Sequence, residues 1–457
     1  MDQTILLSDV VSALSLALDL TEGQPMGHSI RSCMLAIRIG TQLGLDQQQL
    51  TDLYYASLLK DSGCSANSAR MHQILGSDEI QGKREVKLQD WTKISLAGLN
   101  YAIRNVSPHS SALRRITKIV QVGLAQKRNN LELVSARCER GAEIARKIGF
   151  NEATSQAIRA LDEHWNGGGY PTGLAGQQIP ILSRIMNASQ TLEVFAAAGG
   201  PSEALRVLRE RRGSWFDPEV VNAAASLEGD QELWQRVQAA GARESILALE
   251  PGRCLPASEG RIDSLCEAFA GIVDAKSPFT FQHSIGVTEV AVGLAREMGL
   301  GSPKVTIIRR AALLHDIGKL GVSNAILDKP GKLTSGEWEI MKMHPVYTKK
   351  ILAIITGFEE IAAVSAAHHE RLDGSGYPDG MSAKELTLAA RIIAVADVFQ
   401  ALTEKRAYRD SMSADLVLGM MATDVPAKLD ADCFRALRAR YQAFTGKAKT
   451  FANAAGR

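Results

Sequence analysis

Apolar residues along the chain recur at the spacing of helices rather than strands. Segments 202–211 and 414–422 place apolar side chains three and four positions apart, which predicts helices with one buried face. Segment 391–399 is apolar almost all round, which indicates a helix in the core. No segment alternates β-branched with polar residues, and alanine and leucine are abundant, so we predict an all-α fold.

The chain of 457 residues is too long for a single hydrophobic core, so we expect two domains. Proline, glycine and serine cluster between residues 250 and 260, and this composition is typical of a connecting loop. We therefore predict a first domain over residues 1–245, a linker over 246–261 and a second domain over 262–457.

The two predicted domains repeat one plan. The tripeptide His-Ser-Ile begins at residue 28 and again at residue 283, and Gly-Tyr-Pro occupies 169–171 and 376–378. The same number of residues separates His28 from Lys60 and His283 from His315. Internal repetition of this kind sets the architecture, so we expect two copies of one helical domain. The first copy is longer because it carries an insertion at about residues 65–130.

Several histidines and aspartates of the second half lie beside apolar helical stretches. They are His283, His315, Asp316, His344, His368, His369 and Asp397. An aspartate inside an apolar helix needs a cation or hydrogen bonds, because burying an unpaired carboxylate is very costly. Imidazole and carboxylate groups together favour iron, manganese, nickel or zinc, and a set without cysteine is unlike a structural zinc site. The pattern therefore indicates a metal centre.

Two local details and a loop extend this pattern. Lys319 follows Asp316 by one helical turn, so its ammonium group would lie on the same face as the His315-Asp316 pair. Pro345 directly follows His344, which predicts the first turn of a new helix there. The glycine-rich segment 373–378 predicts a loop whose backbone can approach a ligand closely. A metal and a phosphate would account for this combination better than packing.

These residues, with Gly376-Tyr377-Pro378 after the double histidine, resemble the HD-GYP family of bacterial phosphodiesterases over about residues 262–440. That family is a branch of the HD metal-dependent phosphohydrolases. The resemblance implies two tandem HD-type helical bundles, the second with an intact metal centre. It also implies hydrolysis of a cyclic dinucleotide substrate, cyclic di-GMP, to linear pGpG and onward to GMP. Family members that prefer the mixed 3′3′-cyclic GMP-AMP carry the same ligands, so that substrate stays an alternative.

The resemblance also implies roles for individual residues. The seven histidines and aspartates would hold two divalent ions, with Asp316 bridging the ions and Lys319 contacting the scissile phosphate. Two such ions activate water and neutralise phosphate oxygens, and Lys319 would stabilise the transition state. Phe279 stands where members with a third metal have a glutamate, so we expect two ions. The nucleotide pocket would be formed by Lys319, Arg371, Asp373, Gly374, Gly376, Tyr377 and Pro378.

Most ligand positions of the first copy hold other residues. Where the second copy has His315, His344, His368, His369, Asp397 and Lys319, the first has Lys60, Arg137, Leu161, Asp162, Gln190 and Cys64. We therefore expect a degenerate domain without metal, in which Lys60 and Arg137 pair with Asp61 and Asp162. His164 is interpreted as surface or pocket lining. The charged segments 83–87 and 114–118 of the insertion are interpreted as solvated helix faces.

Composition limits the other classes of function. A net charge of +2 disfavours extensive nucleic-acid binding. The sequence contains no run of 18 apolar residues, so we expect no membrane span. The six cysteines are scattered and the N-terminus lacks the basic region of a signal peptide, so we expect a cytoplasmic protein.

Two functions other than cyclic-dinucleotide hydrolysis were weighed. The double histidine and the Gly-Tyr-Pro loop argue against an HD hydrolase that acts on nucleoside triphosphates or (p)ppGpp. A non-catalytic cyclic-nucleotide receptor or scaffold stays open, above all for the first copy. That copy would be regulatory, would form a homodimer interface or would bind a signalling protein.

Overall fold

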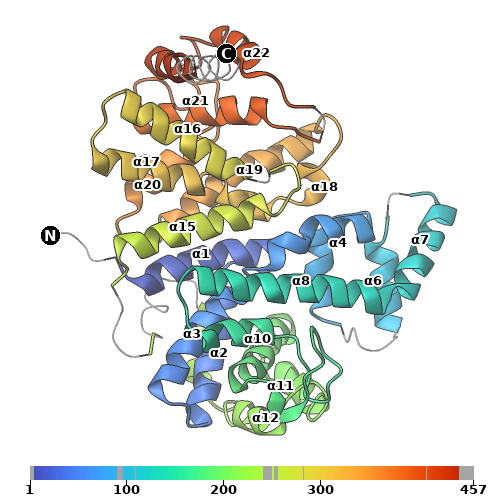
Figure 1. Ribbon diagram of the computed structural model, residues 1–457. Coiled ribbons are helices and arrows are strands. Elements are labelled where there is room, and N and C mark those ends of the chain that lie inside the picture. Colours follow the sequence, from blue (N-terminus) through green and yellow to red (C-terminus); the bar gives the residue numbers. More distant parts are fainter. Residues whose placement is uncertain are drawn as a thin grey trace, which may run out of the picture. The chain divides into compact units, whose positions relative to one another are not determined.

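The computed structural model describes residues 5–89, 96–108, 110–239, 250–251, 256–280, 282–407 and 409–441. Within these ranges the regular elements are helices, and the only β-type pairings are isolated bridges (Figure 1). The all-α prediction is therefore confirmed. None of the helices in these ranges combines the length and the apolar character needed to cross a bilayer.

The chain divides into two compact units. The first unit is Met1–Ala268 with Ser323–Leu327, and the second is Phe269–Val322 with Asp328–Arg457. The division falls within α15 (Glu259–Asp274). Much of the predicted linker at 246–261 lies outside the described residues, so the domain boundaries stay a prediction.

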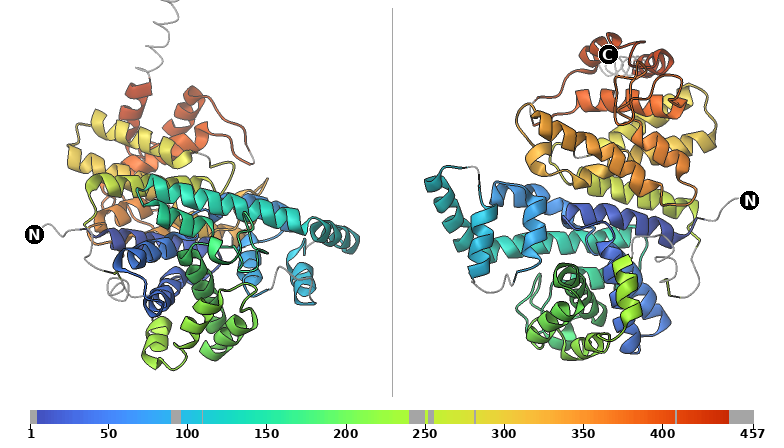
Figure 2. Two further views of the ribbon diagram at one scale, coloured as in Figure 1. Left: turned by 60° about the horizontal axis from the view of Figure 1, so that its bottom comes forward. Right: turned by 180° about the vertical axis from the view of Figure 1, so that it is seen from behind.

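In the first unit α2 (His28–Gln42) packs between α3 (Gln47–Leu59) and α10 (Ile181–Gly199), and α8 (Gln126–Lys147) packs on α9 (Glu152–Arg159). The other elements are α1 (Leu7–Thr21), η1 (Cys64–Asn67), α4 (Ser68–Leu75), α5 (Glu79–Val86), α6 (Leu96–Asn105), α7 (Ala112–Leu124), η2 (Gly176–Gln178), α11 (Pro201–Glu210), α12 (Pro218–Ala225), α13 (Gln231–Ala239) and α18 (Asn324–Leu327). Figure 2 shows α6 and α7, in cyan, standing apart from α2, α3 and α10 of the same unit.

In the second unit α16 (His283–Glu297) packs against α17 (Ser302–Leu314) and α21 (Leu388–Thr403), and α19 (Ser335–Leu352) packs on α20 (Glu359–Ala366). The remaining elements are η3 (Ile317–Gly321) and α22 (Ala414–Ala422). The core between these helices is aliphatic, and α21 contributes Ile392, Ile393 and Val395, none of which is exposed. The predicted core helix over 391–399 is thus part of α21.

Close backbone contacts confirm the internal repeat. A Cβ atom at Gly318 would lie 2.0 Å from the carbonyl oxygen of His344, and one at Gly63 would lie 1.9 Å from that of Arg137. Only glycine allows so close an approach, and both copies use it at the same place. Arg137 therefore occupies in the first unit the position that His344 occupies in the second.

The prediction that Pro345 opens a helix is wrong. α19 begins ten residues earlier, at Ser335, where Thr334 and Glu337 form a capping box. Proline has no N–H to donate to the carbonyl of Met341, the usual partner four residues back. The Nδ1 atom of His344 lies 2.7 Å from that oxygen and donates to it instead. The proline therefore frees a carbonyl that orients the preceding histidine.

The predicted helical turn from His315 to Lys319 is also interrupted. α17 ends at Leu314, and Asp316 precedes the 3₁₀ helix η3. The tighter 3₁₀ spacing still brings residues three apart together. The Nζ atom of Lys319 lies 2.6 Å from Oδ2 of Asp316, so the expected convergence holds with a different backbone.

The insertion is only in part a solvated surface. α7 has no buried residue, which agrees with the interpretation of segment 114–118. Lys83 on α5 is instead only 4% exposed, and its Nζ atom lies 3.0 Å from the carbonyl oxygen of Cys64 and 3.2 Å from Oε1 of Glu22. Lys87 pairs with the same carboxylate. The interpretation of segment 83–87 as a solvated face is therefore wrong, because a buried carboxylate draws both lysines inward.

Candidate metal centre

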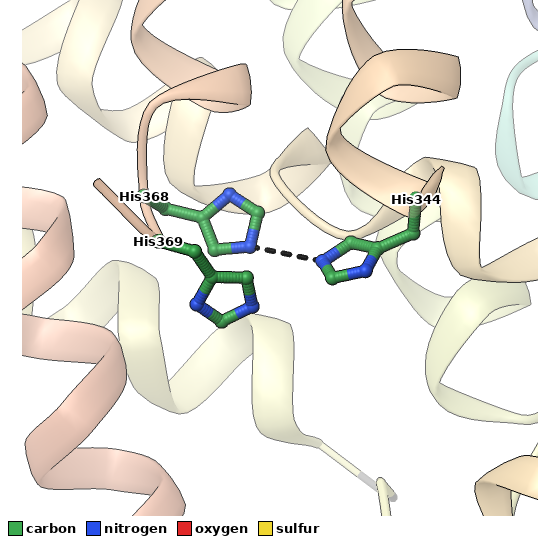
Figure 3. Close-up of side chains that lie close together, drawn as sticks. All are labelled: His344, His368 and His369. Carbon is green, nitrogen blue, oxygen red and sulfur yellow. Dashed lines mark hydrogen bonds between the residues drawn. The ribbon is translucent and has the colours of Figure 1, made fainter. Parts of the chain in front are cut away.

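The seven predicted ligands lie together in the second unit, on segments far apart in the sequence. His283 begins α16, His315 follows α17, Asp316 precedes η3, His344 lies in α19, His368 and His369 follow α20, and Asp397 lies in α21. Six of them are buried, and His369 keeps 21% of its side chain exposed. Figure 3 shows His344, His368 and His369 directed toward one another.

The carboxylate of Asp316 lies between two groups of histidines. Its Oδ1 atom is 3.4 Å from Nε2 of His344 and 3.6 Å from Nε2 of His368. Its Oδ2 atom is 3.3 Å from Nε2 of His315 and 3.9 Å from Nε2 of His283. Ligands about 2.1 Å from one ion lie about 3–3.5 Å apart, so each oxygen is placed to share an ion with its own histidine pair.

Asp397 completes the second group. Its Oδ1 atom lies 3.2 Å from Nε2 of His283 and 3.9 Å from Nε2 of His315. Its Oδ2 atom lies 3.7 Å from Nδ1 of His369. The His369 side chain also lies close enough to those of His344 and His368 to share an ion with them. The arrangement offers two adjoining sets of ligand atoms rather than one.

Backbone carbonyls fix the tautomers of three histidines. The Nδ1 atoms of His315, His344 and His368 donate to carbonyl oxygens three residues earlier in the chain, at 2.7, 2.7 and 2.6 Å. In the neutral ring each Nε2 atom is then the acceptor, and it faces the cluster, as in metal-bound histidines. Nε2 of His344 lies 3.2 Å from Nε2 of His368 (Figure 3). Two lone pairs at that distance repel unless a cation lies between them.

Buried atoms without hydrogen bonds point to the same requirement. Among the described residues, Nε2 of His315 and Oδ1 of Asp316 are buried and make no hydrogen bond. Such atoms are rare because each costs free energy that a protein normally recovers with a partner. A divalent ion bound by imidazole and carboxylate would satisfy both, so the residues fit the metal site that the sequence predicts.

The charges of the site suit metal binding. Burial lowers the pKa of His344 to about 3, in spite of the nearby Asp316 carboxylate, so the imidazole is neutral and able to coordinate. Burial opposes ionisation of Asp316, but the neighbouring His315 imidazole and the charge of Lys319 hold its pKa well below the usual range. Neutral imidazole and ionised carboxylate are the forms that bind metal.

His283 differs from the other histidines in its partners. Burial alone would lower its pKa, but hydrogen bonds to Asp397 and Glu404 raise it to about 9. The Nδ1 atom lies 2.9 Å from Oε2 of Glu404, which therefore orients the ring. Glu404 was missed by sequence reasoning, because it lies far along the chain and outside every motif.

Glu370 is a second residue that the sequence reasoning missed. It is 1% exposed, and its carboxylate accepts hydrogen bonds from the backbone N–H groups of Asp379 at 2.7 Å and Met381 at 2.9 Å. It therefore holds the far side of the Gly-Tyr-Pro loop. Glu163 occupies the matching position in the first copy and accepts from Thr172 at 2.7 Å, so alignment of the repeats could have identified this role.

The loop places Tyr377 beside the candidate metal ligands. Its ring centroid lies 4.8 Å from that of His369 and 5.8 Å from that of Trp338. Asp373 instead accepts hydrogen bonds from the backbone and hydroxyl of Ser375, so it shapes the turn. A Cβ atom on Gly376 would lie 2.4 Å from the backbone nitrogen of Arg371, which explains this glycine. Gly374 and Pro378 are partly buried members of the same loop.

The first copy holds cations where the second holds its ligands. Lys60 pairs with Asp61, and Nε of Arg137 lies 3.0 Å from Oδ2 of Asp162, as predicted. Glu22, Asp61 and Cys64 lie close enough to bind an ion, but lysines already neutralise both carboxylates. Burial raises the pKa of the Cys64 thiol well above its usual value, so it is not a thiolate ligand.

We predict that Asp61→Asn lowers the free energy of unfolding of the first domain by about 3–5 kcal/mol. Lys60 and Asp61 are 5% and 3% exposed, so the variant leaves a buried ammonium group without its partner. The double variant Lys60→Met/Asp61→Asn removes both charges and should recover most of this loss. Urea denaturation of the unchanged chain, the single variant and the double variant measures the free energy of unfolding. An equal loss of stability in the two variants would contradict the pairing of Lys60 with Asp61.

Comparison with known proteins places the chain in a family. The family model of the HD domain matches residues 123–220 and 267–433, which together make up more than half of the chain and lie in both copies. The 3′3′-cGAMP-specific phosphodiesterase 3 of Vibrio cholerae is 40% identical over 436 residues, covering 95% of this chain and 94% of that protein. The cyclic di-GMP phosphodiesterase response regulator RpfG of Xanthomonas campestris pv. campestris is 40% identical over 169 residues, covering 36% of this chain and 45% of that protein.

A solved structure agrees with these relatives. The crystal structure of a cyclic GMP-AMP specific phosphodiesterase from V. cholerae matches with a TM-score of 0.67 and 36% sequence identity, covering 96% of this chain and 98% of that one. The match of the family model in two segments also supports the repeat read from the backbone contacts. The chain therefore belongs to the HD-domain family of phosphohydrolases and, by its metal-ligand motifs and its relatives, to the HD-GYP branch of that family.

Proposed function

We propose that the chain is a metal-dependent phosphodiesterase that hydrolyses a cyclic dinucleotide, with 3′3′-cyclic GMP-AMP as the preferred substrate. The observation that carries the activity is the placing of the Asp316 carboxylate, whose two oxygens face two separate groups of histidines. A phosphodiester resists attack by water because both the phosphate and an activated water are negative. Two ions held by the seven ligands would supply a nucleophile near neutral pH and neutralise the phosphate.

The sequence favoured cyclic di-GMP, and the comparisons favour the alternative. The relative that matches along nearly the whole chain is named for 3′3′-cGAMP, whereas the cyclic di-GMP phosphodiesterase RpfG matches over 36% of the chain. The shared ligand set does not discriminate between the two substrates, because the ions that it would hold act on the phosphate and not on the bases. The proposal for the mixed dinucleotide therefore rests on sequence similarity that extends over both copies, across 95% of this chain.

The residues of the chain supply positioning and fixed charge. The Lys319 ammonium group, held 2.6 Å from Asp316 and 17% exposed, provides a positive charge where the phosphate gains negative charge. Glu404 holds the ring of His283, and Glu370 holds the loop that carries Tyr377. Hydrolysis breaks one P–O bond, with the elements of water added across it, and opens the ring to a linear dinucleotide.

The complete ligand set also argues against a receptor without turnover. A binding protein has no need for histidines whose Nδ1 atoms donate to backbone carbonyls and whose Nε2 atoms face a buried carboxylate. The first copy, which has lost this arrangement, is the part of the chain to which a receptor role still applies.

We expect the purified chain, supplied with manganese or iron, to cleave 3′3′-cyclic GMP-AMP with at least tenfold higher kcat/KM than cyclic di-GMP, a difference of about 1.4 kcal/mol. Separation of products by liquid chromatography at several times measures both substrates and shows whether the linear dinucleotide accumulates. Preference for cyclic di-GMP would return the assignment to the substrate that the sequence favoured. Absence of cleavage of either would overturn the proposed function.

A further inference from the structure

The first unit contains a cavity where the metal centre lies in the second. Its volume is about 170 Å³, and α5, α8, α10 and the segment after α11 line it. Arg137, Asp162 and Gln190 in its wall occupy the positions that His344, His369 and Asp397 have in the second copy. The first copy therefore has a cavity at the position of the candidate metal site, but other residues stand at the ligand positions.

Positive charge exceeds negative charge around this space. Four cationic side chains line the cavity against two carboxylates; they are Lys83, Lys87, Arg137 and Arg211 against Glu22 and Asp162. Lys87 and Arg137 are 16% and 24% exposed in their side chains, so they are shielded from bulk water but still reach the cavity. Charges in such a partly dry site attract an anion more strongly than they would on an open surface.

One wall of the cavity is aromatic. The ring of Trp215 stacks on that of His164, with centroids 4.1 Å apart and planes at 22°. The guanidinium carbon of Arg211 lies 4.4 Å from the centroid of Trp215. His164 is 2% exposed, so the structure confirms it as pocket lining rather than surface. Stacked rings and a planar guanidinium form a surface suited to a flat aromatic group.

An unsatisfied amide oxygen indicates a ligand with a hydrogen-bond donor. Asn67 lines the cavity and is 7% exposed, and its Nδ2 atom donates to the carbonyl oxygen of Leu133 at 3.2 Å. Among the described residues its Oδ1 atom is buried and has no hydrogen-bond partner. A buried acceptor of this kind calls for a donor, such as an amino group on a ring.

We propose that this cavity binds a purine nucleoside monophosphate without metal and does not hydrolyse it. The phosphate would lie near Lys87 and Arg137, and the base near the Trp215 wall and Asn67. The cavity volume is below the about 300–1,000 Å³ of sites for drug-sized ligands, which argues against a complete cyclic dinucleotide. Lys60, Lys83 and Lys87 pair with the carboxylates that a metal would need. The four cationic side chains of the cavity wall still exceed its two carboxylates by two, and this surplus charge would act on the phosphate.

The test is isothermal titration of the full-length, chelator-treated chain with GMP, AMP and inorganic phosphate. GMP or AMP is expected to bind, and more tightly than inorganic phosphate. Lys87→Met, which leaves Glu22 paired with Lys83, should weaken nucleotide binding about tenfold or more, whereas Lys87→Arg should retain it. Arg211→Met should weaken nucleotide binding more than phosphate binding. Circular dichroism establishes that each variant is folded.

Two matched lysine variants serve as controls. Lys118→Met lies on α7 outside the cavity and should bind as the unchanged chain does. Lys319→Met removes a lysine charge from the candidate metal site of the second copy and should leave nucleotide binding in the first copy unchanged. The proposal is overturned if neither nucleotide binds at millimolar concentration, if Lys87→Met binds normally, or if only Lys319→Met loses binding. Equal affinity for inorganic phosphate and nucleotide would show that the cavity does not contact the base, and would overturn the proposal of a nucleotide site. None of these outcomes depends on turnover in the second copy.

Discussion

Asp316→Asn is expected to lower the turnover of the cyclic dinucleotide by about 10³-fold or more, equivalent to several kcal/mol of transition-state stabilisation. The carboxylate lies between the two histidine groups, with Oδ1 3.4 Å from Nε2 of His344 and Oδ2 3.3 Å from Nε2 of His315. Asparagine keeps the shape but offers one neutral oxygen, so it cannot serve two ions. Measurement of kcat together with bound metal by elemental analysis tests this, and an asparagine variant with normal metal content and turnover would contradict it.

Two variants make this result specific. Lys60→Met/Asp61→Asn changes the matching position of the first copy and should leave turnover within about twofold, because no part of the proposed chemistry lies there. Glu404→Gln weakens the orientation of His283 and should reduce turnover by about 10–100-fold, the usual effect of a residue behind a metal ligand. The loss of turnover should therefore be largest for Asp316→Asn, smaller for Glu404→Gln and smallest for Lys60→Met/Asp61→Asn.

The side chains that gather around Asp316 could be proposed as ligands from sequence because most of them belong to local motifs. His315 and Asp316 are adjacent, His368 and His369 are adjacent, and Asp397 is conspicuous as a charge in an apolar helix. The internal repeat gave a second constraint, since it fixed which residues of the first copy occupy ligand positions. The pairing of Lys60 with Asp61 followed from charge alone.

Other features depend on packing, and no local pattern encodes them. Glu404 reaches His283 across 121 positions of sequence, through the fold and not through spacing. From the sequence, Lys83 resembles an exposed residue of a helix. It is buried because the tertiary structure brings the Glu22 carboxylate next to it, and no local pattern predicts that contact. Pro345 was assigned by its preference for helix starts, but the stronger signal was the capping box at Thr334. Local preferences are overruled where a buried charge or a better cap competes.

Removal of metal is expected to abolish hydrolysis and to destabilise the second domain alone. In the second copy the closely spaced Nε2 atoms of His344 and His368, and the unpartnered Oδ1 of Asp316, need a cation. In the first copy Lys60 already supplies a cation from within the chain. An ion at about 1,000 times its Kd stabilises a domain by about 4 kcal/mol, and each kcal/mol shifts the Tm of a domain of this size by about 2–4 °C. The second domain should therefore melt about 8–16 °C lower after chelation.

Tryptophan fluorescence can separate the two transitions. Trp338 is the only tryptophan in the sequence of the second unit, and it lies 5.8 Å from Tyr377 beside the metal centre. The melting curve of the unchanged chain minus that of Trp338→Phe reports the second domain, and the remaining tryptophans report the first. Chelation should shift the difference curve to lower temperature and leave the curve of Trp338→Phe unchanged. Added manganese or iron should reverse the shift. A common shift of both curves, or none, would mean that the histidine cluster is stable without an ion, and the assignment of the site as a metal centre would fail.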